Sequence, residues 1–309
     1  WHDSACQPTM GDIMLCNTTA TDKRSALRRA LENKKLLRFP GAFMPLAAIA
    51  IEEAGFDGIY LSGGAFSASL GLPDIGLTTL DEVATLTRRI SDVTNLPLIV
   101  DADTGFGGPI NAARSVIEIE NAGAAGLHLE DQIHPKRCGH LEGKELVSTT
   151  EMVQRIHAAV GARVDKNFLI IARTDATAVE GFDAAVARAR HYIAAGADMI
   201  FAEALISAIE FKNFAEAIAP TPLLANMTEF GKSPVLSVDE LQTAGAALVI
   251  YPVTTLRIAM QAIINGINHI KMHGKQTDPL IETMQPRKDL YRMIAYQDYV
   301  DLDKKIAGY

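Results

Sequence analysis

The sequence predicts an α/β fold, a (β/α)₈ TIM barrel in which eight parallel strands close into a cylinder inside a ring of helices. Three observations predict it: a length of 309 residues, eight short apolar segments separated by stretches with helical spacing, and an Ala-Gly pair that recurs before strands. Barrels of this class routinely reach such a length as one domain. We therefore expect one barrel domain over residues 23–309, which includes C-terminal helices.

Composition limits the function. Hydrophobic residues make up 48% of the chain and charged residues 21%, which is enough for a sizeable core. The net charge of -8 argues against a nucleic-acid or acidic-lipid partner, because such surfaces need clustered Lys and Arg. No apolar run approaches the roughly 20 residues of a membrane span, so we expect a soluble protein without a membrane partner. With only three cysteines, we expect the reducing cytoplasm rather than a disulfide framework.

The N-terminal segment differs from the rest. Residues 1–22 are polar and without pattern, and they begin with Trp1 rather than Met. We expect a tag remnant, a processed leader or a mobile extension. This segment is left out of the site.

Eight apolar, β-rich runs are the candidate strands. Stretches with helical apolar spacing lie between most of them, for example residues 80–90, 112–119 and 184–193. This alternation indicates parallel strands joined by helices. The candidate strands are residues 36–39, 58–62, 97–101, 126–130, 168–172, 199–202, 222–225 and 247–251.

A weak repeat favours the barrel. An Ala-Gly pair ends at Gly55, Gly123, Gly196 and Gly245, each shortly before a candidate strand. Glycine can take the left-handed conformation that ends a helix and turns the chain into the next strand. Four such stops with eight strands suit a closed barrel better than a doubly wound open sheet, although periodicity alone leaves the open sheet as the alternative.

The C-terminal segment has no strand partner. From Pro279 onward, apolar and aromatic side chains follow one another at mixed helical spacing, among them Tyr291, Tyr296 and Tyr299. We expect extra helices that pack on a neighbour or cover the barrel.

Polar residues follow seven of the apolar runs. In a barrel the carboxyl ends of all strands meet at one face, where active sites of this fold are built. A single such residue is often only a loop cap, but the repetition around the barrel favours a pocket. The residues are Ser62-Gly63-Gly64, Asp101 and Asp103, Glu130-Asp131, Arg173 and Asp175, Glu203, Asn226 and Thr228, and Tyr251.

Asp101 and Asp103 place two carboxylates at one strand exit, with Glu130 after the next strand. Oxygen ligands without a Cys/His set favour Mg²⁺, with Mn²⁺ possible, and Mg²⁺ is commonly held by one or two carboxylates plus water and substrate oxygens. The plainer interpretation is that these acids form ion pairs with basic side chains. Both interpretations stay open, and the basic candidates are Arg173, Lys136 and His140.

Cys138 lies between basic side chains after the fourth candidate strand, in the run Lys136-Arg137-Cys138-Gly139-His140. Nearby cations lower the pKa of a thiol below its usual value of about 8.5. A lone loop cysteine is usually inert, but on the active face of a barrel this one can act as a proton donor or a nucleophile.

These stretches resemble the isocitrate lyase and phosphoenolpyruvate mutase superfamily, most closely its 2-methylisocitrate lyase branch. The resemblance covers about residues 24–303, and Cys138-Gly139-His140 is its most specific motif, because the mutase and phosphonopyruvate hydrolase branches lack that cysteine. The other matching stretches are Tyr60 to Gly64, Gly71 to Asp74, Val100 to Asp103, Gly126 to Asp131, Ala172 to Ala176, Leu224 to Gly231 and Thr283 to Arg287.

The resemblance implies cleavage of (2S,3R)-2-methylisocitrate to pyruvate and succinate in the methylcitrate cycle of propionate catabolism. It implies that Asp101 and Asp103 hold Mg²⁺ and that Cys138 protonates the succinate carbanion, with Lys136 and His140 beside it. The base stays open between Tyr60 and a metal-linked carboxylate. The implied substrate-binding residues are Ser62, Gly63, Gly64, Cys138, Gly139, Arg173, Glu203, Asn226, Thr228, Arg257 and Arg287.

The resemblance further implies a homotetramer whose C-terminal helices are exchanged between subunits. One departure concerns Phe201-Ala202-Glu203-Ala204, where the close family often has Pro at the second position, so the turn there is expected to differ slightly. Phe201 also stands where isocitrate lyases tend to have Trp, which leaves room for a methyl group. The rival functions are cleavage of isocitrate or of another 2,3-substituted malate, and a barrel kept only as a binding protein.

Overall fold

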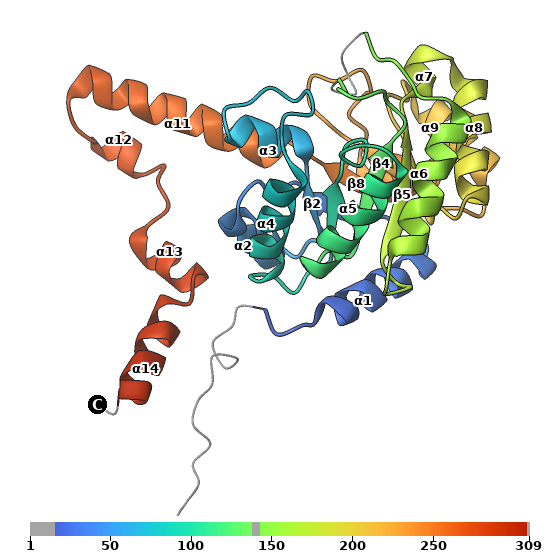
Figure 1. Ribbon diagram of the computed structural model, residues 1–309. Helices are drawn as coiled ribbons and strands as arrows, with labels where there is room; N and C mark the ends of the chain where they lie inside the picture. Colours follow the sequence, from blue (N-terminus) through green and yellow to red (C-terminus); the bar gives the residue numbers. More distant parts are fainter. Residues whose placement is uncertain (1–15, 138–142, 308–309) are drawn as a thin grey trace, which may run out of the picture.

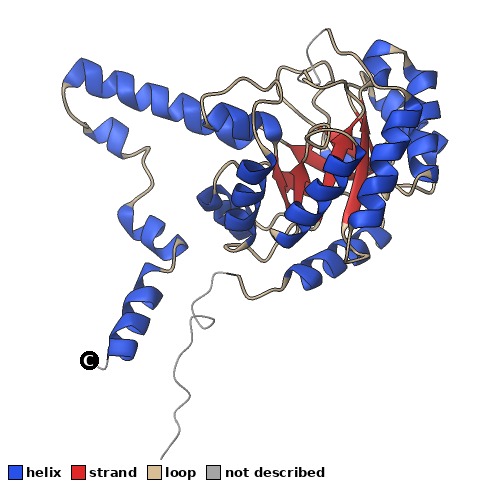
Figure 2. Ribbon diagram, viewed as in Figure 1, coloured by secondary structure: helices blue, strands red, loops and turns tan. Residues whose placement is uncertain are grey.

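The computed structural model describes residues 16–137 and 143–307, and its centre is a barrel of eight parallel strands (Figures 1 and 2). The strands are hydrogen-bonded in the order β1-β8-β7-β6-β5-β4-β3-β2. This confirms the predicted (β/α)₈ fold. The strands are β1 (Leu37–Pro40), β2 (Ile59–Leu61), β3 (Leu98–Asp101), β4 (Gly126–Glu130), β5 (Leu169–Thr174), β6 (Met199–Ala202), β7 (Leu223–Asn226) and β8 (Ala246–Tyr251).

The barrel closes at a narrow seam between β1 and β2. An isolated parallel bridge joins Gly41 to Tyr60, and the Ala42 N–H donates to the Tyr60 carbonyl at 2.9 Å. On the other side, the Gly41 N–H donates to the Tyr251 carbonyl at 2.9 Å. Gly41 is required there, because a Cβ would lie 2.1 Å from the carbonyl oxygen of Pro252.

The helices alternate with the strands, as the apolar spacing predicts. Each of the four predicted glycine stops has a positive φ, from 75° at Gly55 to 103° at Gly196, so each ends a helix as expected. The helices of the barrel are α1 (Ala20–Glu32), α2 (Pro45–Glu53), α3 (Gly63–Ser69), α4 (Leu80–Ser91), α5 (Pro109–Asn121), α6 (Thr149–Ala162), α7 (Ala176–Val179), α8 (Phe182–Ala194), α9 (Ala208–Ile218) and α10 (Val238–Thr243).

Two apolar clusters form the core. The larger lies between the strands and the surrounding helices, and it includes Leu127, Ile170 and Phe214. The smaller fills the inside of the barrel with residues such as Phe39 and Phe201. Strand residues alternate between these two clusters, because successive side chains of a strand point to opposite faces. The site therefore rests on a rigid, filled cylinder.

The ordered N-terminal part begins earlier than residue 23. Residues 20–22, which we assigned to the extension, form the first turn of α1, and Thr19 caps this helix by accepting the Asp22 N–H at 3.2 Å. The Asn17 N–H and the Thr18 hydroxyl also donate to the Asn95 side chain. Residues 1–15 lie outside the described residues, so their assignment as an extension stays a prediction.

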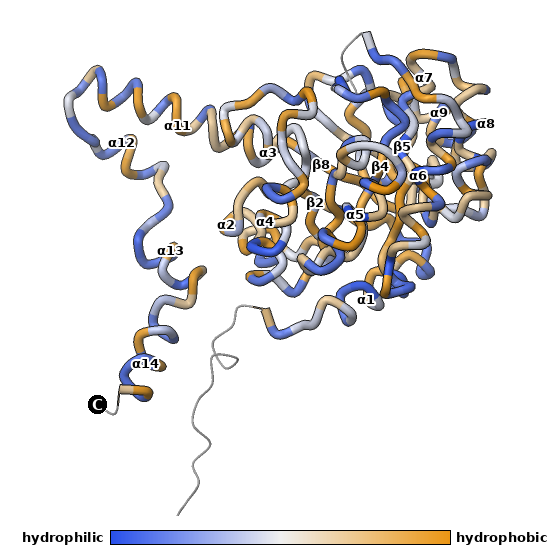
Figure 3. Tube along the Cα trace, viewed as in Figure 1, coloured by the Kyte–Doolittle hydropathy of each residue, from blue (hydrophilic) through white to orange (hydrophobic). Residues whose placement is uncertain are grey.

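Four helices follow the last strand and form an arm that leaves the barrel (Figure 1). In the longest, α11, Leu256 is the one residue recorded as buried. Isoleucines such as Ile258 and Ile267 are exposed, and Figure 3 shows apolar positions along the arm. An ion pair of 2.7 Å between Arg292 and Glu53 joins α13 to α2. These helices are α11 (Thr254–His273), α12 (Asp278–Ile281), α13 (Arg287–Met293) and α14 (Tyr296–Ala307).

None of the described helices combines the length and the apolar character that crossing a membrane requires.

Candidate active site

A cavity of about 240 Å³ opens at the carboxyl ends of the strands. Most predicted site residues line it or contact residues that do. The lining residues that we predicted are Tyr60, Ser62, Gly64, Asp101, Lys136, Arg173, Glu203, Asn226, Thr228 and Arg257. The structure thus brings together side chains from most of the barrel.

Asp101, the last residue of β3, accepts hydrogen bonds on both carboxylate oxygens. Its Oδ2 accepts the Gly63 N–H at 3.0 Å, and its Oδ1 accepts the Asp103 N–H at 3.1 Å. The Tyr60 hydroxyl lies 3.5 Å from Oδ2. A Cβ at position 63 would lie 2.9 Å from Oδ2, so a glycine is needed for this close approach.

His128 and Tyr60 form a buried pair beside Asp101. The Tyr60 hydroxyl lies 2.7 Å from His128 Nε2, and the two rings are stacked. Burial lowers the pKa of His128 to about 4, so the ring is neutral at neutral pH. Burial also raises the pKa of Tyr60 well above its usual value of about 10. The pair is therefore a neutral hydrogen-bonded unit that can pass on a proton.

The two predicted metal ligands have opposite pKa shifts. Burial raises the pKa of Asp101, but His128, Lys136 and Arg173 outweigh it and lower the pKa to about 2. For Asp103, burial prevails over Lys136 and raises the pKa to about 6. Asp103 also has a positive φ of 47°, which non-glycine residues adopt rarely and which is found at functional sites.

Lys136 crosses from the loop after β4 to these carboxylates. Its buried ammonium group lies 2.8 Å from Asp103 Oδ1 and forms a second ion pair with Asp74. The carboxylates around Lys136 outweigh its burial and raise its pKa well above the usual range, so the side chain stays charged. The ion-pair interpretation from the sequence is thus confirmed for Lys136.

Negative charge exceeds positive charge in this region. Neither side-chain oxygen of the buried Glu130 has a hydrogen-bond partner among the described residues, and burial raises the pKa of Glu130 well above its usual value. Among the described residues around these side chains, six carboxylates lie near three cations. The carboxylates are Asp74, Asp101, Asp103, Glu130, Asp175 and Glu203, and the cations are Lys136, Lys144 and Arg173.

This charge imbalance fits a divalent cation. Within residues 16–137 and 143–307, no group of three or more His, Cys, Asp or Glu side chains is arranged to hold a metal by itself. A pair of carboxylates such as Asp101 and Asp103 suits Mg²⁺, which keeps several water or substrate oxygens. The unpartnered oxygens of Glu130 can accept hydrogen bonds from such waters.

Arg173, near the end of β5, is a second cation that lines the cavity. Its Nε lies 3.0 Å from Asp175 Oδ2 and 3.3 Å from Glu130 Oε2, and its Nη2 lies 3.2 Å from Glu203 Oε2. The guanidinium also lies over the Phe201 ring, 5.0 Å from its centroid. A buried, always charged guanidinium at this point can bind a substrate carboxylate.

The remaining predicted residues near the cavity have mainly local contacts. Ser62 caps α3 by accepting the Ala65 N–H at 3.2 Å. The Asn226 amide donates to Glu203 at 3.3 Å, which orients both side chains. Arg257, on α11, pairs with Glu229 at 3.3 Å at the rim. These positions suit polar contacts with a small acid.

Arg287 is the predicted residue that the fold does not bring to the cavity. It is exposed on α13, in the arm that leaves the barrel. Three other predicted residues, Cys138, Gly139 and His140, lie outside the described residues. Their segment joins two described ends, and the Gln132–Leu146 bridge holds these ends together.

His128 and Asp74 are two of the site residues that we did not single out. His128 stands inside an apolar run, where a histidine is expected to be a core residue, and only the fold reveals its Tyr60 and Asp101 contacts. Asp74 follows a glycine-rich turn and contacts Lys136 from a distant loop. Both belong to stretches that match the family, which was the one available signal.

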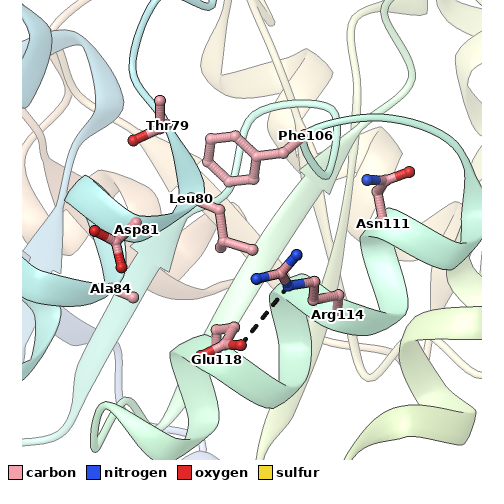
Figure 4. Close-up of a pocket in the computed structure, with 8 residues that line it drawn as sticks. All are labelled: Thr79, Leu80, Asp81, Ala84, Phe106, Asn111, Arg114 and Glu118. Carbon is pink, nitrogen blue, oxygen red and sulfur yellow. Dashed lines mark ion pairs between the residues drawn. The ribbon is translucent and has the colours of Figure 1, made fainter.

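A second cavity, of about 260 Å³, lies outside this site between α4 and α5 (Figure 4). It is lined by Phe106, by Leu80 and by the ion pair between Arg114 and Glu118, whose atoms are 3.7 Å apart. Both charged side chains are largely exposed. The buried charges at the carboxyl ends of the strands are absent from this lining, so the first cavity is the candidate active site.

Sequence comparison with known proteins relates this chain to lyases. The family model described as phosphoenolpyruvate phosphomutase matches residues 27–271. A probable 2-methylisocitrate lyase 1 of Corynebacterium glutamicum is 56% identical over 93% of this chain and 94% of its own. The 2-methylisocitrate lyase of Escherichia coli is 48% identical over 91% of this chain and 96% of its own.

Solved structures agree with the fold. A 2,3-dimethylmalate lyase superimposes with a TM-score of 0.87 and 36% identity, covering 94% of this chain and 96% of its own. A phosphonopyruvate hydrolase in complex with oxalate and Mg²⁺ superimposes with a TM-score of 0.83 and 30% identity, covering 91% and 98%. That related structure thus contains a metal ion.

Proposed function

The chain belongs to the phosphoenolpyruvate phosphomutase family, and on this premise we propose that it is a carbon–carbon lyase that cleaves (2S,3R)-2-methylisocitrate to pyruvate and succinate. Relatives with this activity in their names cover nine-tenths of the chain or more. The structural observation that carries the proposal is the cavity lined by Asp101, Lys136 and Arg173, with Asp103 paired to Lys136 beside it. Such a cavity offers both a cation site and a guanidinium to a substrate with several carboxylates.

The substrate is held between two sides of the cavity. Arg173 binds one carboxylate, while Asn226, Thr228 and Arg257 bind the others from β7, the loop after it and α11. Ser62 with the N–H groups near Gly64 binds the pyruvate end. These contacts orient the bond that breaks, which lowers the entropic part of the barrier.

Asp101 and Asp103 hold Mg²⁺, with Mn²⁺ as a substitute, in this proposal. Held by these two carboxylates, a divalent cation would supply the Lewis acidity that makes a substrate hydroxyl easier to ionise. Glu130 and Glu203 orient polar groups around this end of the cavity.

The reaction needs one base and one acid. Loss of the hydroxyl proton makes the pyruvate carbonyl, the carbon–carbon bond breaks, and its electron pair remains on the succinate carbon. The base is Tyr60, whose hydroxyl lies 2.7 Å from His128 Nε2, or a carboxylate linked to the metal such as Asp103. Cys138 donates the proton that completes succinate, with Lys136 and His140 stabilising its thiolate.

Arg287 completes the site from another subunit in this proposal. The exposed apolar side chains of α11, among them Ile258 and Ile267, need burial, and a homotetramer with exchanged helices provides it. The exchange would carry α13 and Arg287 to the cavity of a neighbour. Light scattering at micromolar concentration tests this, and a monomer would contradict it. We infer a cytoplasmic location from the cysteine content.

The decisive experiment compares substrates on the same preparation. We expect 2-methylisocitrate to be cleaved with a kcat/KM about 10- to 200-fold above that of isocitrate, because one methyl group in an apolar pocket contributes about 1–3 kcal/mol. Succinate release serves as the common readout, and 2,3-dimethylmalate is the third substrate. Equal or reversed values for isocitrate would reassign the protein to isocitrate cleavage.

A further inference from the structure

Arg173 is held along one edge of its guanidinium. Asp175 contacts this edge twice, with Oδ2 at 3.0 Å from Nε and Oδ1 at 3.3 Å from Nη2. Among the contacts recorded for residues 16–137 and 143–307, none uses Nη1. Because Arg173 lines the cavity, this remaining edge is available to a substrate carboxylate.

Asp175 is in turn fixed by groups outside the cavity. It is fully buried, and the Lys144 ammonium lies 2.8 Å from its Oδ1. Its own N–H donates to Asp131 Oδ1 at 2.9 Å, while the Tyr192 hydroxyl donates to Asp131 Oδ2 at 2.8 Å. The carboxylate that orients Arg173 therefore has a rigid backbone and a charged partner of its own.

Lys144 changes the electrostatics of this unit. Arg173 is paired most closely with Asp175, and Glu130 and Glu203 also lie within 3.3 Å of it, so carboxylate charge acts strongly on the guanidinium. The ammonium of Lys144 offsets the Asp175 charge at 2.8 Å, which leaves more of the positive charge of Arg173 available to an incoming anion. Lys144 is itself nearly inaccessible, so it cannot bind the substrate directly.

We propose that Lys144 and Asp175 are positioning residues that hold Arg173 with its free edge toward the substrate and preserve its charge for the substrate carboxylate. The proposal rests on the proposed function, because it takes Arg173 as the carboxylate-binding residue. By this proposal Lys144 increases the affinity for the substrate although it does not line the cavity. An arginine contact that is equal in the bound substrate and the transition state affects KM and leaves kcat nearly unchanged.

The test replaces Lys144 by methionine, which keeps the length of the side chain and removes its charge. Lys23→Met is the matched control, because Lys23 is also a buried lysine, and its ammonium donates to the Ser91 carbonyl at 2.8 Å, away from the cavity. We expect Lys144→Met to raise KM about tenfold or more with kcat within about threefold. Lys23→Met should lower the thermal midpoint and leave KM unchanged.

Succinate affinity, measured by calorimetry on the same variants, separates this proposal from the proposed function. If the wild type does not cleave 2-methylisocitrate but Lys144→Met still weakens succinate binding, the assigned substrate is wrong and the positioning role stands. An unchanged succinate affinity and KM in Lys144→Met would overturn the positioning role. If that variant does not fold, Asp175→Asn and Lys144→Arg replace it. The first should weaken succinate binding and the second should retain it, and the reverse pattern would also overturn the role.

Discussion

The two ends of the barrel use buried charge in opposite ways. At the amino ends of the strands, Arg24 is surrounded by acceptors: its Nε donates to the Ala124 carbonyl at 2.9 Å, its Nη2 to the Glu120 carbonyl at 2.6 Å, and its Nη1 pairs with Asp165 at 3.4 Å. The Glu120 carboxylate accepts two further backbone N–H groups. At the carboxyl ends, carboxylates outnumber cations among the described residues, and the Glu130 oxygens accept no hydrogen bond from them.

This difference assigns the two ends of the barrel different roles: buried charges at the amino end stabilise the fold, and buried charges at the carboxyl end bind ligands. A buried charge whose hydrogen bonds are all made within the chain gains nothing from a ligand, and it holds the elements around it together. A buried charge that lacks partners is costly in the folded chain alone, and a ligand or metal ion that supplies them is bound correspondingly well. The same barrel therefore has one end complete in itself and one end that a substrate completes.

The largest effect that tests this comparison of the two ends is a loss of activity on substitution at the carboxyl end. We expect Asp101→Asn or Asp103→Asn to lower kcat/KM about 10³-fold or more, because a neutral amide does not offset a divalent cation and Lewis acidity contributes several kcal/mol. Thermal stability should change little or rise for Asp103→Asn, because burial disfavours the charge of that carboxylate, and it should fall for Asp101→Asn, because the site favours the charged form of Asp101. The measurement is a titration of activity with Mg²⁺. Full wild-type activity in excess EDTA would remove the metal from the mechanism.

The matching change at the amino end should affect stability alone. We expect Arg24→Met to lower the free energy of unfolding by about 3 kcal/mol, because Glu120 and Asp165 lose a buried cation. At a temperature where the variant is folded, kcat and KM should equal those of the wild type. Urea unfolding and kinetics on one preparation check both. A selective loss of kcat would show that the two ends are not independent.

The acid assignment gives a third prediction. We expect Cys138→Ser to lower kcat about 10²-fold, because serine is nearly isosteric with cysteine but far less acidic. Succinate affinity and the thermal midpoint serve as controls and should stay close to the wild type. Near-normal turnover would eliminate Cys138 as the acid, and a large drop in the midpoint would give it a structural role instead.

The smallest effect concerns pH. The folded pKa of His128 is about 4, below its unfolded value of about 6.5, so the unfolded chain binds the proton more tightly. The stabilisation is complete above pH 6.5 and is lost as pH falls toward 4, about 2 kcal/mol of it between pH 7 and 5. His128→Gln should remove this part of the acid sensitivity. Urea unfolding of both proteins at the two pH values isolates it, and parallel curves would contradict the assignment.

Much of the fold was predictable because its signals are local. All eight strands lie within two residues of their predicted bounds at each end, since short apolar runs and glycine stops depend only on neighbours in the chain. The candidate site was also largely predictable, because parallel strands bring their carboxyl ends to one face. Tyr60, Asp101 and Arg173 meet in one cavity for this reason.

The remainder depends on contacts that a linear pattern does not contain. His128 stands in the middle of β4 and resembles a core residue, and its role comes from Tyr60 and Phe201 on other strands. Lys144 was not singled out, because its role depends on its ion pair with Asp175, which follows a different strand. Arg287 matches a family motif, yet a single subunit leaves it on an exposed helix.

The narrow seam between β1 and β2 has a consequence for where the barrel opens locally. Elsewhere, neighbouring strands share registers of two to five residues, whereas β1 and β2 share the single bridge between Gly41 and Tyr60, with one more backbone hydrogen bond from the Asp57 N–H to the Arg38 carbonyl at 3.3 Å. In a closed barrel, we expect the strand pairing with the fewest hydrogen bonds to open first, while the other pairings stay intact. Opening here would pull directly on Tyr60. Tyr60, a residue of the candidate site, thus lies at the strand pairing with the fewest hydrogen bonds. A substrate that contacts Tyr60 would therefore stabilise this pairing against local opening.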